Sequence, residues 1–318
     1  ALYLTAIDKY GHELWRWTFP VDKLNQQTEP ISFLSIRPTY TETENDLTVK
    51  ANKRTFIFSK KDGQLKGVSV DNRKISFANG PRFIGARRAD RSLDQFYNHD
   101  DEKAKEKDRT YSEFPDAAVF TKLDVKQDGG DLIVTANYKL GNLDKAQWTI
   151  SPSGDLVLDY TYNFSGVVDL MGICFDYPED QVISKRWLGA GPYRVWQNRI
   201  HGTQYDVWEN DYNDPIPGET FTYPEFKGYF GDVSWMNIRT KEGIISLTNE
   251  TPDAYVGVYQ PRDGRDRLLY TLPESGISLL NVIPPVRNKV NSTDLCGPSS
   301  QPKWVNGPQT GRIVFRFE

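Results

Sequence analysis

The chain has 318 residues, enough for one large β domain or two ordinary ones and too many for a small scaffold held together by disulfides. Its 39 Lys and Arg residues against 43 Asp and Glu residues give a formal net charge of -4, which lacks the basic footprint of a duplex or phosphate-backbone binder, so we expect no nucleic-acid partner. Aromatic residues make up 13% of the chain and Met occurs only 2 times, which favours an aromatic, β-branched core over a helical one.

The first residues predict a β-hairpin. Residues 2–7 and 13–19 are rich in strand formers and flank a turn at Asp8–Gly11. Because an isolated hairpin is at best marginally stable, we interpret residues 1–21 as the terminal hairpin of a preceding β-sandwich. Residues 22–48 are polar and contain prolines, and we expect them to form a connector.

Residues 49–318 contain many alternating runs separated by turn signals. Such runs flank Asp62-Gly63, Asp128-Gly129 and Ser153-Gly154, and residues 312–317 predict a closing strand. No stretch shows a convincing apolar period of 3.6 over about 11 residues, the helical signal. We therefore predict an all-β fold, a large two-sheet antiparallel sandwich, for residues 49–318. The apolar stretch 275–286 is too short for a bilayer span and contains prolines, so we expect no membrane partner.

Motifs for metal, cofactor and nucleophilic chemistry are missing. The residues His12, His99 and His201 have no metal-ligand spacing, and neither a nucleophile elbow nor a complete dinucleotide fingerprint occurs, so we expect no cofactor. The stretch Asn210–Asp214 could hold a structural Ca²⁺, although an Asx turn explains it better. We interpret Cys174, in an apolar run, as a buried inert thiol, and a disulfide to Cys296 is left open.

Residues 187–235 are unusually rich in aromatic side chains, interleaved with Asn, Arg, His and acidic residues. Aromatic rings stack on the apolar face of a pyranose, and planar amide and guanidinium groups bind its hydroxyls. Any single aromatic residue here is more simply explained as core, but the cluster as a whole predicts a carbohydrate site. The candidate residues are Tyr193, Arg194, Trp196, Asn198, Arg199, His201, Trp208 and Trp235.

The segment 187–199, Trp-Leu-Gly-Ala-Gly-Pro-Tyr-Arg-Val-Trp-Gln-Asn-Arg, resembles the Gly-x-Gly-Pro-x-Glu-x-Tyr-x-Asp-Arg signature in the C-terminal domain of family 2 β-galactosidases. Residues 58–65, 80–83 and 223–226 resemble further stretches of that domain in the same order. The resemblance covers residue 50 to the end and implies a galactose-mutarotase-like β-supersandwich that follows an immunoglobulin-like domain. Arg194, Trp196 and Asn198 replace the Glu, Tyr and Asp of the signature.

The resemblance also implies a function. In the resembling enzymes, two Glu residues on a separate barrel cleave the glycosidic bond, and we interpret Glu209, Asp211, Asp214 and Glu219 of this chain as solvated loop acids. We therefore expect a non-catalytic, carbohydrate-binding and active-site-shaping domain of a β-galactosidase-like glycoside hydrolase acting on oligo- or polysaccharides. Its partners would be a carbohydrate ligand and the catalytic barrel and immunoglobulin-like domains of a longer parent chain, in a periplasmic or extracellular location.

Two alternatives remain open at this point. The same aromatic and polar residues would serve a self-standing carbohydrate-binding protein. The same fold would also serve a sugar epimerase or a polysaccharide lyase, because Asn98-His99 faintly resembles the Asn-His element of mutarotases and a His can move the anomeric proton.

Overall fold

The computed structural model describes residues 2–19, 36–88, 111–211, 228–258, 272–285 and 297–318. Two large antiparallel sheets and one separate hairpin make up these residues, with two short 3-10 turns, η1 (Glu179–Gln181) and η3 (Pro298–Ser300). The predicted all-β, two-sheet antiparallel architecture is confirmed. No helix in the described ranges is long and apolar enough to cross a membrane.

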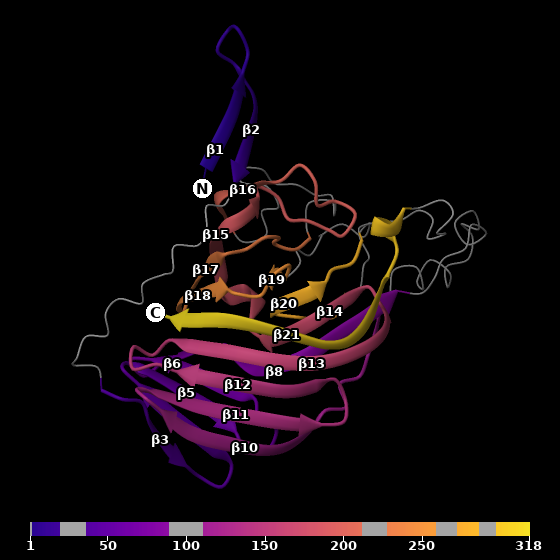
Figure 1. The fold of residues 1–318 in the computed structure, drawn as a ribbon. Coiled ribbons are helices and arrows are strands. Elements are labelled where there is room, and N and C mark those ends of the chain that lie inside the picture. The colour runs from indigo at the N-terminus through magenta and orange to yellow at the C-terminus, as the bar shows by residue number, and fades with distance from the viewer. Residues whose placement is uncertain (1, 20–35, 89–110, 212–227, 259–271, 286–296) are drawn as a thin grey trace.

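The nine-stranded sheet forms the front layer of the body in Figure 1. Its neighbouring strands pair antiparallel, and the C-terminal strand β21 lies at its centre, between β13 and β18. In spatial order the strands are β10 (Val119–Asp128), β11 (Asp131–Lys139), β12 (Leu143–Ile150), β13 (Leu156–Val168), β21 (Lys303–Phe317), β18 (Gly243–Asn249), β17 (Trp235–Thr240), β15 (Val182–Gly191) and β16 (Gln204–Asp211).

The ten-stranded sheet packs behind it. Its spatial order is β19 (Tyr255–Val258), β20 (Ile277–Val282), β14 (Leu170–Asp176), β8 (Ala78–Arg88), β6 (Leu65–Val70), β5 (Arg54–Ser59), β4 (Asp46–Ala51) and β3 (Thr39–Glu42), with β7 (Arg73–Ile75) paired to β6 and β9 (Tyr111–Glu113) paired to β8. Strand β3 lies within the segment expected to be a connector, because Thr39 to Glu42 pair in register with Lys50 to Leu47 and so extend the sheet.

The core between the sheets is aromatic, as the composition predicts. Along β12 and most of β13, alternate residues are buried, in the period of two that a half-buried strand requires. Trp148 packs edge-on against Phe175, and Phe77 stacks on Phe175 with ring centroids 4.7 Å apart. Cys174 is a buried free thiol on β14, and burial raises its pKa to about 11, while Cys296 lies outside the described residues. The inert-thiol interpretation fits this environment.

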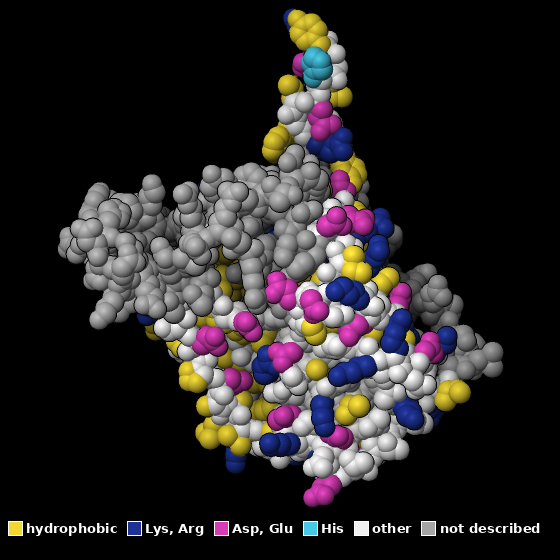
Figure 2. All heavy atoms as spheres, turned by 180° about the vertical axis from the view of Figure 1, so that it is seen from behind, with side chains coloured by type: hydrophobic (Ala, Val, Ile, Leu, Met, Phe, Trp, Pro, Cys, Tyr) yellow, Lys and Arg dark blue, Asp and Glu magenta, His cyan; other side chains and the backbone are white. Residues whose placement is uncertain are grey.

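The hairpin of β1 (Leu2–Ile7) and β2 (Glu13–Phe19) projects from the body, as Figures 1 and 2 show. Hydrophobic side chains are exposed along it, among them Leu4, Leu14 and Trp17. The hairpin meets the nine-stranded sheet at its edge strand, where the Tyr3 hydroxyl donates a hydrogen bond of 2.9 Å to Asp206 of β16. The pairing of the hairpin is as predicted, and its assignment to a preceding immunoglobulin-like domain, with boundaries at residues 21 and 48, stays a prediction.

Candidate functional site

The scaffold of the candidate site is the antiparallel pair of β15 and β16 at the edge of the nine-stranded sheet. The two glycines of the Gly-x-Gly-Pro element lie at the end of β15 and permit close approach. A Cβ at Gly191 would lie 2.4 Å from the Trp208 ring, and a Cβ at Gly189 would lie 2.9 Å from the carbonyl oxygen of Gly231. Any side chain at these two positions would therefore push neighbouring groups away.

The chain after β15 forms a loop over residues 192–203 that distant segments fix in place. Val195 exchanges two backbone hydrogen bonds with Tyr229, at 2.7 and 2.8 Å. Gln197 donates from its backbone to Pro284 O at 3.1 Å and from its side chain to Gln301 O at 2.7 Å. Because three segments far apart in sequence hold the loop, it presents its surface side chains from a fixed backbone.

Two predicted site residues, Arg194 and Trp196, lie beneath the loop and not on its surface. Trp196 is 3% exposed and packs edge-to-face against Tyr229, with ring centroids 5.7 Å apart, in the smaller of two apolar clusters. Arg194 is 1% exposed, with its guanidinium 5.8 Å from the centroid of the Phe230 ring. In this conformation neither side chain offers a face to a ligand, and both contribute to packing.

Four predicted residues stay together at the surface of the loop: Tyr193, Asn198, Arg199 and His201, which we call the loop site. Arg199 and His201 are exposed, and Tyr193 and Asn198 are half-buried. The Tyr193 hydroxyl donates to the His201 carbonyl oxygen at 3.4 Å and so links the two ends of the loop. The phenol, amide, guanidinium and imidazole groups supply donors and acceptors of the kind that hydroxyl-rich ligands need.

The two remaining residues, Trp208 and Trp235, point to opposite faces of the nine-stranded sheet. Trp208 is in register with the fully buried Trp187 and packs against the main core, and its indole donates to Gly189 O at 3.2 Å. Trp235 is in register with Leu188, the next residue, so its side chain lies on the other face. The eight predicted residues thus occupy four environments, and their role in carbohydrate binding stays a prediction.

Of the acidic candidates, only Glu209 and Asp211 lie within the described residues. Glu209 and Asp211 are exposed on β16, while Asp214, Glu219 and His99 lie outside the described residues. Asn210 and Asp211 belong to the edge strand β16, because both pair with β15, while the rest of the stretch expected to form an Asx turn, residues 212–214, lies outside the described residues. Within the described ranges, no group of three or more His, Cys, Asp or Glu side chains could hold a metal ion.

Sequence reasoning missed two contacts beside the loop. Tyr205 of β16 and Ser234 form a hydroxyl pair at 2.6 Å, and Tyr3 of the hairpin reaches Asp206 across 203 positions of sequence. The hydrogen bond to Asp206 raises the pKa of Tyr3, because it favours the protonated phenol. No local sequence pattern predicts either contact, since each depends on pairing between strands that are distant in sequence.

The chain resembles known proteins in its family and in its fold. A family model described as the beta-galactosidase small chain matches residues 50–282. Among solved structures, galactose 1-epimerase from Lactobacillus acidophilus NCFM has 9% identity and a TM-score of 0.50, covering 89% of this chain and 99% of that chain. An aldose epimerase homologue from C. elegans has 8% identity and a TM-score of 0.41, covering 88% and 99%. No curated protein sequence matches the chain. At such identities the likeness to the epimerase is one of fold, and it confirms the predicted galactose-mutarotase-like sandwich.

Proposed function

The chain belongs to the beta-galactosidase small chain family, and from this membership we propose that it is a non-catalytic, carbohydrate-contacting domain of a family 2 β-galactosidase-like glycoside hydrolase acting on oligo- or polysaccharides. The observation that carries the proposal is the fixed loop 192–203. Its backbone is held by Tyr229, Pro284 and Gln301, and it displays the loop site at the edge of the sheet. A preorganised set of polar groups loses little entropy on binding, which favours recognition of a hydroxylated ligand.

The chemistry of the loop site supports binding without catalysis. Glycoside hydrolysis needs one carboxylic acid as a proton donor and a carboxylate as a nucleophile or base. The loop site supplies a phenol, an amide, a guanidinium and an imidazole, and none of these is a carboxylic acid. Such groups can orient a sugar, so we assign the bond-breaking carboxylates to another domain of a parent enzyme.

The proposed role also implies partners for this domain. Both faces of the hairpin carry exposed apolar side chains, and an uncovered two-stranded ribbon of this kind suits packing against further β-structure. We propose that an immunoglobulin-like domain covers the hairpin and that a catalytic barrel adjoins the loop site in a longer parent chain. Polysaccharide substrates would place the parent enzyme in the periplasm or outside the cell.

Calorimetric titration tests the binding role directly. We expect millimolar to micromolar affinity for galactosides or related oligosaccharides, as for a shallow polar site. Arg199→Ala and His201→Ala should each weaken binding about tenfold, because each removes side-chain hydrogen bonds to the ligand. Arg239→Ala is the matched control, since Arg239 is also exposed but lies on β17. Equal affinities in the Arg199 and Arg239 variants would argue against the loop site.

A second measurement tests the absence of catalysis. The purified chain should neither release nitrophenol from nitrophenyl β-galactoside nor accelerate the mutarotation of galactose. Turnover in either assay that survives repurification, and that a single substitution in the chain abolishes, would contradict a non-catalytic role.

A further inference from the structure

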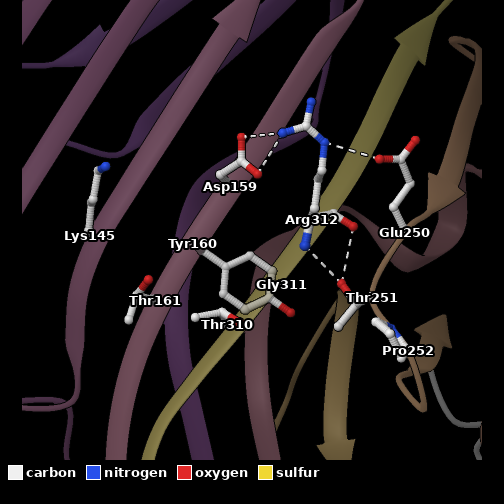
Figure 3. Close-up of a pocket in the computed structure, with 10 residues that line it drawn as sticks. All are labelled: Lys145, Asp159, Tyr160, Thr161, Glu250, Thr251, Pro252, Thr310, Gly311 and Arg312. Atoms are coloured by element: carbon white, nitrogen blue, oxygen red, sulfur yellow. Dashed lines mark hydrogen bonds and ion pairs between the residues drawn. The ribbon is translucent and has the colours of Figure 1, made fainter.

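A hollow lies on the nine-stranded sheet where β18 separates from β21 (Figure 3). The register of these strands ends with Asn249 opposite Ile313, after which Glu250 N donates to Arg312 O at 3.0 Å and the Thr251 side chain also binds the backbone of Arg312. The Thr251 hydroxyl accepts from Arg312 N at 2.9 Å and donates to Arg312 O at 3.1 Å. Beside β13 and β21, this separation leaves a cavity of about 340 Å³, a volume in the range of small-ligand sites.

The polar wall of this β13–β21 cavity is built around Arg312. Both carboxylate oxygens of Asp159 accept from Arg312 Nη1, each at 2.8 Å, and Glu250 Oε2 accepts from Nε at 3.0 Å. Two acids from different segments therefore fix the plane of the guanidinium (Figure 3). Its Nη2 makes no hydrogen bond to any described part of the chain and stays available as a donor.

The floor of the cavity depends on a glycine. A Cβ at Gly311 would lie 2.2 Å from the Tyr160 hydroxyl oxygen, so only glycine lets the Tyr160 ring cross β21 at this point. Thr161 and Thr310 are in register with each other, one residue along from Tyr160 and Gly311, so their side chains lie on the outer face of the sheet. Tyr160 itself is buried in the main core beneath β21, so the cavity presents hydroxyl groups and charged side chains, which are donors and acceptors for the hydroxyl groups of a sugar.

The charged side chains that line the cavity have no net charge. Arg312 and Lys145 each carry one positive charge, and Asp159 and Glu250 each carry one negative charge. An anion would meet two carboxylates here, and a cation would meet a guanidinium and an ammonium. Fixed donors and acceptors without net charge instead suit a neutral ligand rich in hydroxyl groups. We propose that the β13–β21 cavity binds one uncharged sugar residue, at a site separate from the loop site.

The test is a titration of the whole chain followed by saturation-transfer NMR and calorimetry. The probes are methyl β-galactoside and methyl α-glucoside, with glucuronate, glucosamine and inorganic phosphate as charged competitors. We expect millimolar binding of at least one neutral glycoside and no displacement by the charged probes. Arg312→Met should weaken this binding about tenfold, the effect of losing one or two hydrogen bonds.

The chain offers a matched control on the same strand. Arg316 of β21 is also exposed and also held by an acid, Asp155, at 2.8 and 3.0 Å, but it lies outside the cavity. Arg316→Met should leave glycoside binding unchanged. Thr310→Val, which keeps the shape of an exposed side chain and removes its hydroxyl, tests the same cavity if Arg312→Met does not fold.

The outcomes separate this proposal from the loop site. Loss of binding in Arg312→Met and Thr310→Val, with binding retained in Arg199→Ala, supports the cavity and contradicts the loop site as the binding locus. Loss only in Arg199→Ala and His201→Ala overturns the cavity and supports the loop site. No binding of any neutral glycoside by the folded chain, or stronger binding of a charged probe, also overturns the cavity.

Discussion

The aromatic region 187–235 and the β13–β21 cavity use their side chains in opposite ways. In the aromatic region, Trp187 and Trp196 are buried, and Trp208 packs against the main core. In the cavity, the charged groups of Arg312 and Glu250 are about half exposed and bonded to each other. In this chain a dense run of aromatic residues marks packing first, whereas the polar hollow arises from residues that no motif connects.

The greatest loss of stability should separate a packing Trp from a surface Trp. Trp196→Ala removes a ring that is 3% exposed, and we expect a loss of about 3–5 kcal/mol in the free energy of unfolding. Trp304→Ala, on β21 and 71% exposed, should change it by less than about 0.5 kcal/mol. Urea unfolding followed by circular dichroism measures both. Similar small losses of stability in the two variants would contradict a packing role for Trp196 and make it a candidate ligand-binding residue again.

A smaller effect tests the close approach at the Gly-x-Gly-Pro element. Gly191→Ala places a methyl group 2.4 Å from the Trp208 ring, and the resulting shift should cost about 1–3 kcal/mol of stability. Gly67→Ala on β6 is the control, because no atom lies within 4 Å of its added Cβ. Thermal unfolding of both variants gives the comparison. If Gly191→Ala were as stable as Gly67→Ala, the packing between β15 and β16 would be looser than the structure shows.

The smallest effect concerns the ion pairs of β21. Burial alone would raise the pKa of Asp155, but its hydrogen bonds and charge attraction to Arg316 outweigh burial, so the pKa is lowered. A carboxyl group whose pKa is lower in the folded state than in the unfolded chain stabilises the protein when the pH is above the unfolded pKa of about 4. This contribution is lost as the pH falls through the folded-state pKa.

Arg316→Met should therefore lower stability by about 0.5–1 kcal/mol at pH 7, since the pair is partly exposed. The difference from wild type should shrink as the pH falls below about 4. Chemical unfolding at several pH values measures it, with Arg239→Met as a control for the loss of a charge. A difference in stability that stays constant with pH would mean that Arg316 does not lower the pKa of Asp155.

Much of the fold follows from the sequence by local rules. The turns at Asp62-Gly63 and Ser153-Gly154 join paired strands, because glycine adopts the positive φ angles of 74° and 84° found there. The closing strand predicted at residues 312–317 is the end of β21. Strand β3 was harder to foresee, because four exposed residues show no apolar alternation and owe their conformation to pairing with β4.

The candidate sites also contain a part that the sequence predicts and a part that it does not. The sequence located the Gly-x-Gly-Pro element and the polar loop after it, since these are contiguous. It could not separate Trp208 from Trp235, because the face to which a strand residue points depends on the register with its neighbours. It also gave no signal for the cavity, whose residues Lys145, Asp159, Glu250 and Arg312 come from four separate segments.

The all-β class, the aromatic core and the family follow from the sequence alone, because alternation, turn residues and the Gly-x-Gly-Pro spacing are all local properties of the chain. Which aromatic residues are core, and which polar residues share a surface, depends instead on the tertiary structure. This is because burial and electrostatic balance arise between strands far apart in sequence. β13 and β21, about half the chain apart, meet side by side, and their pairing brings Asp159 to Arg312.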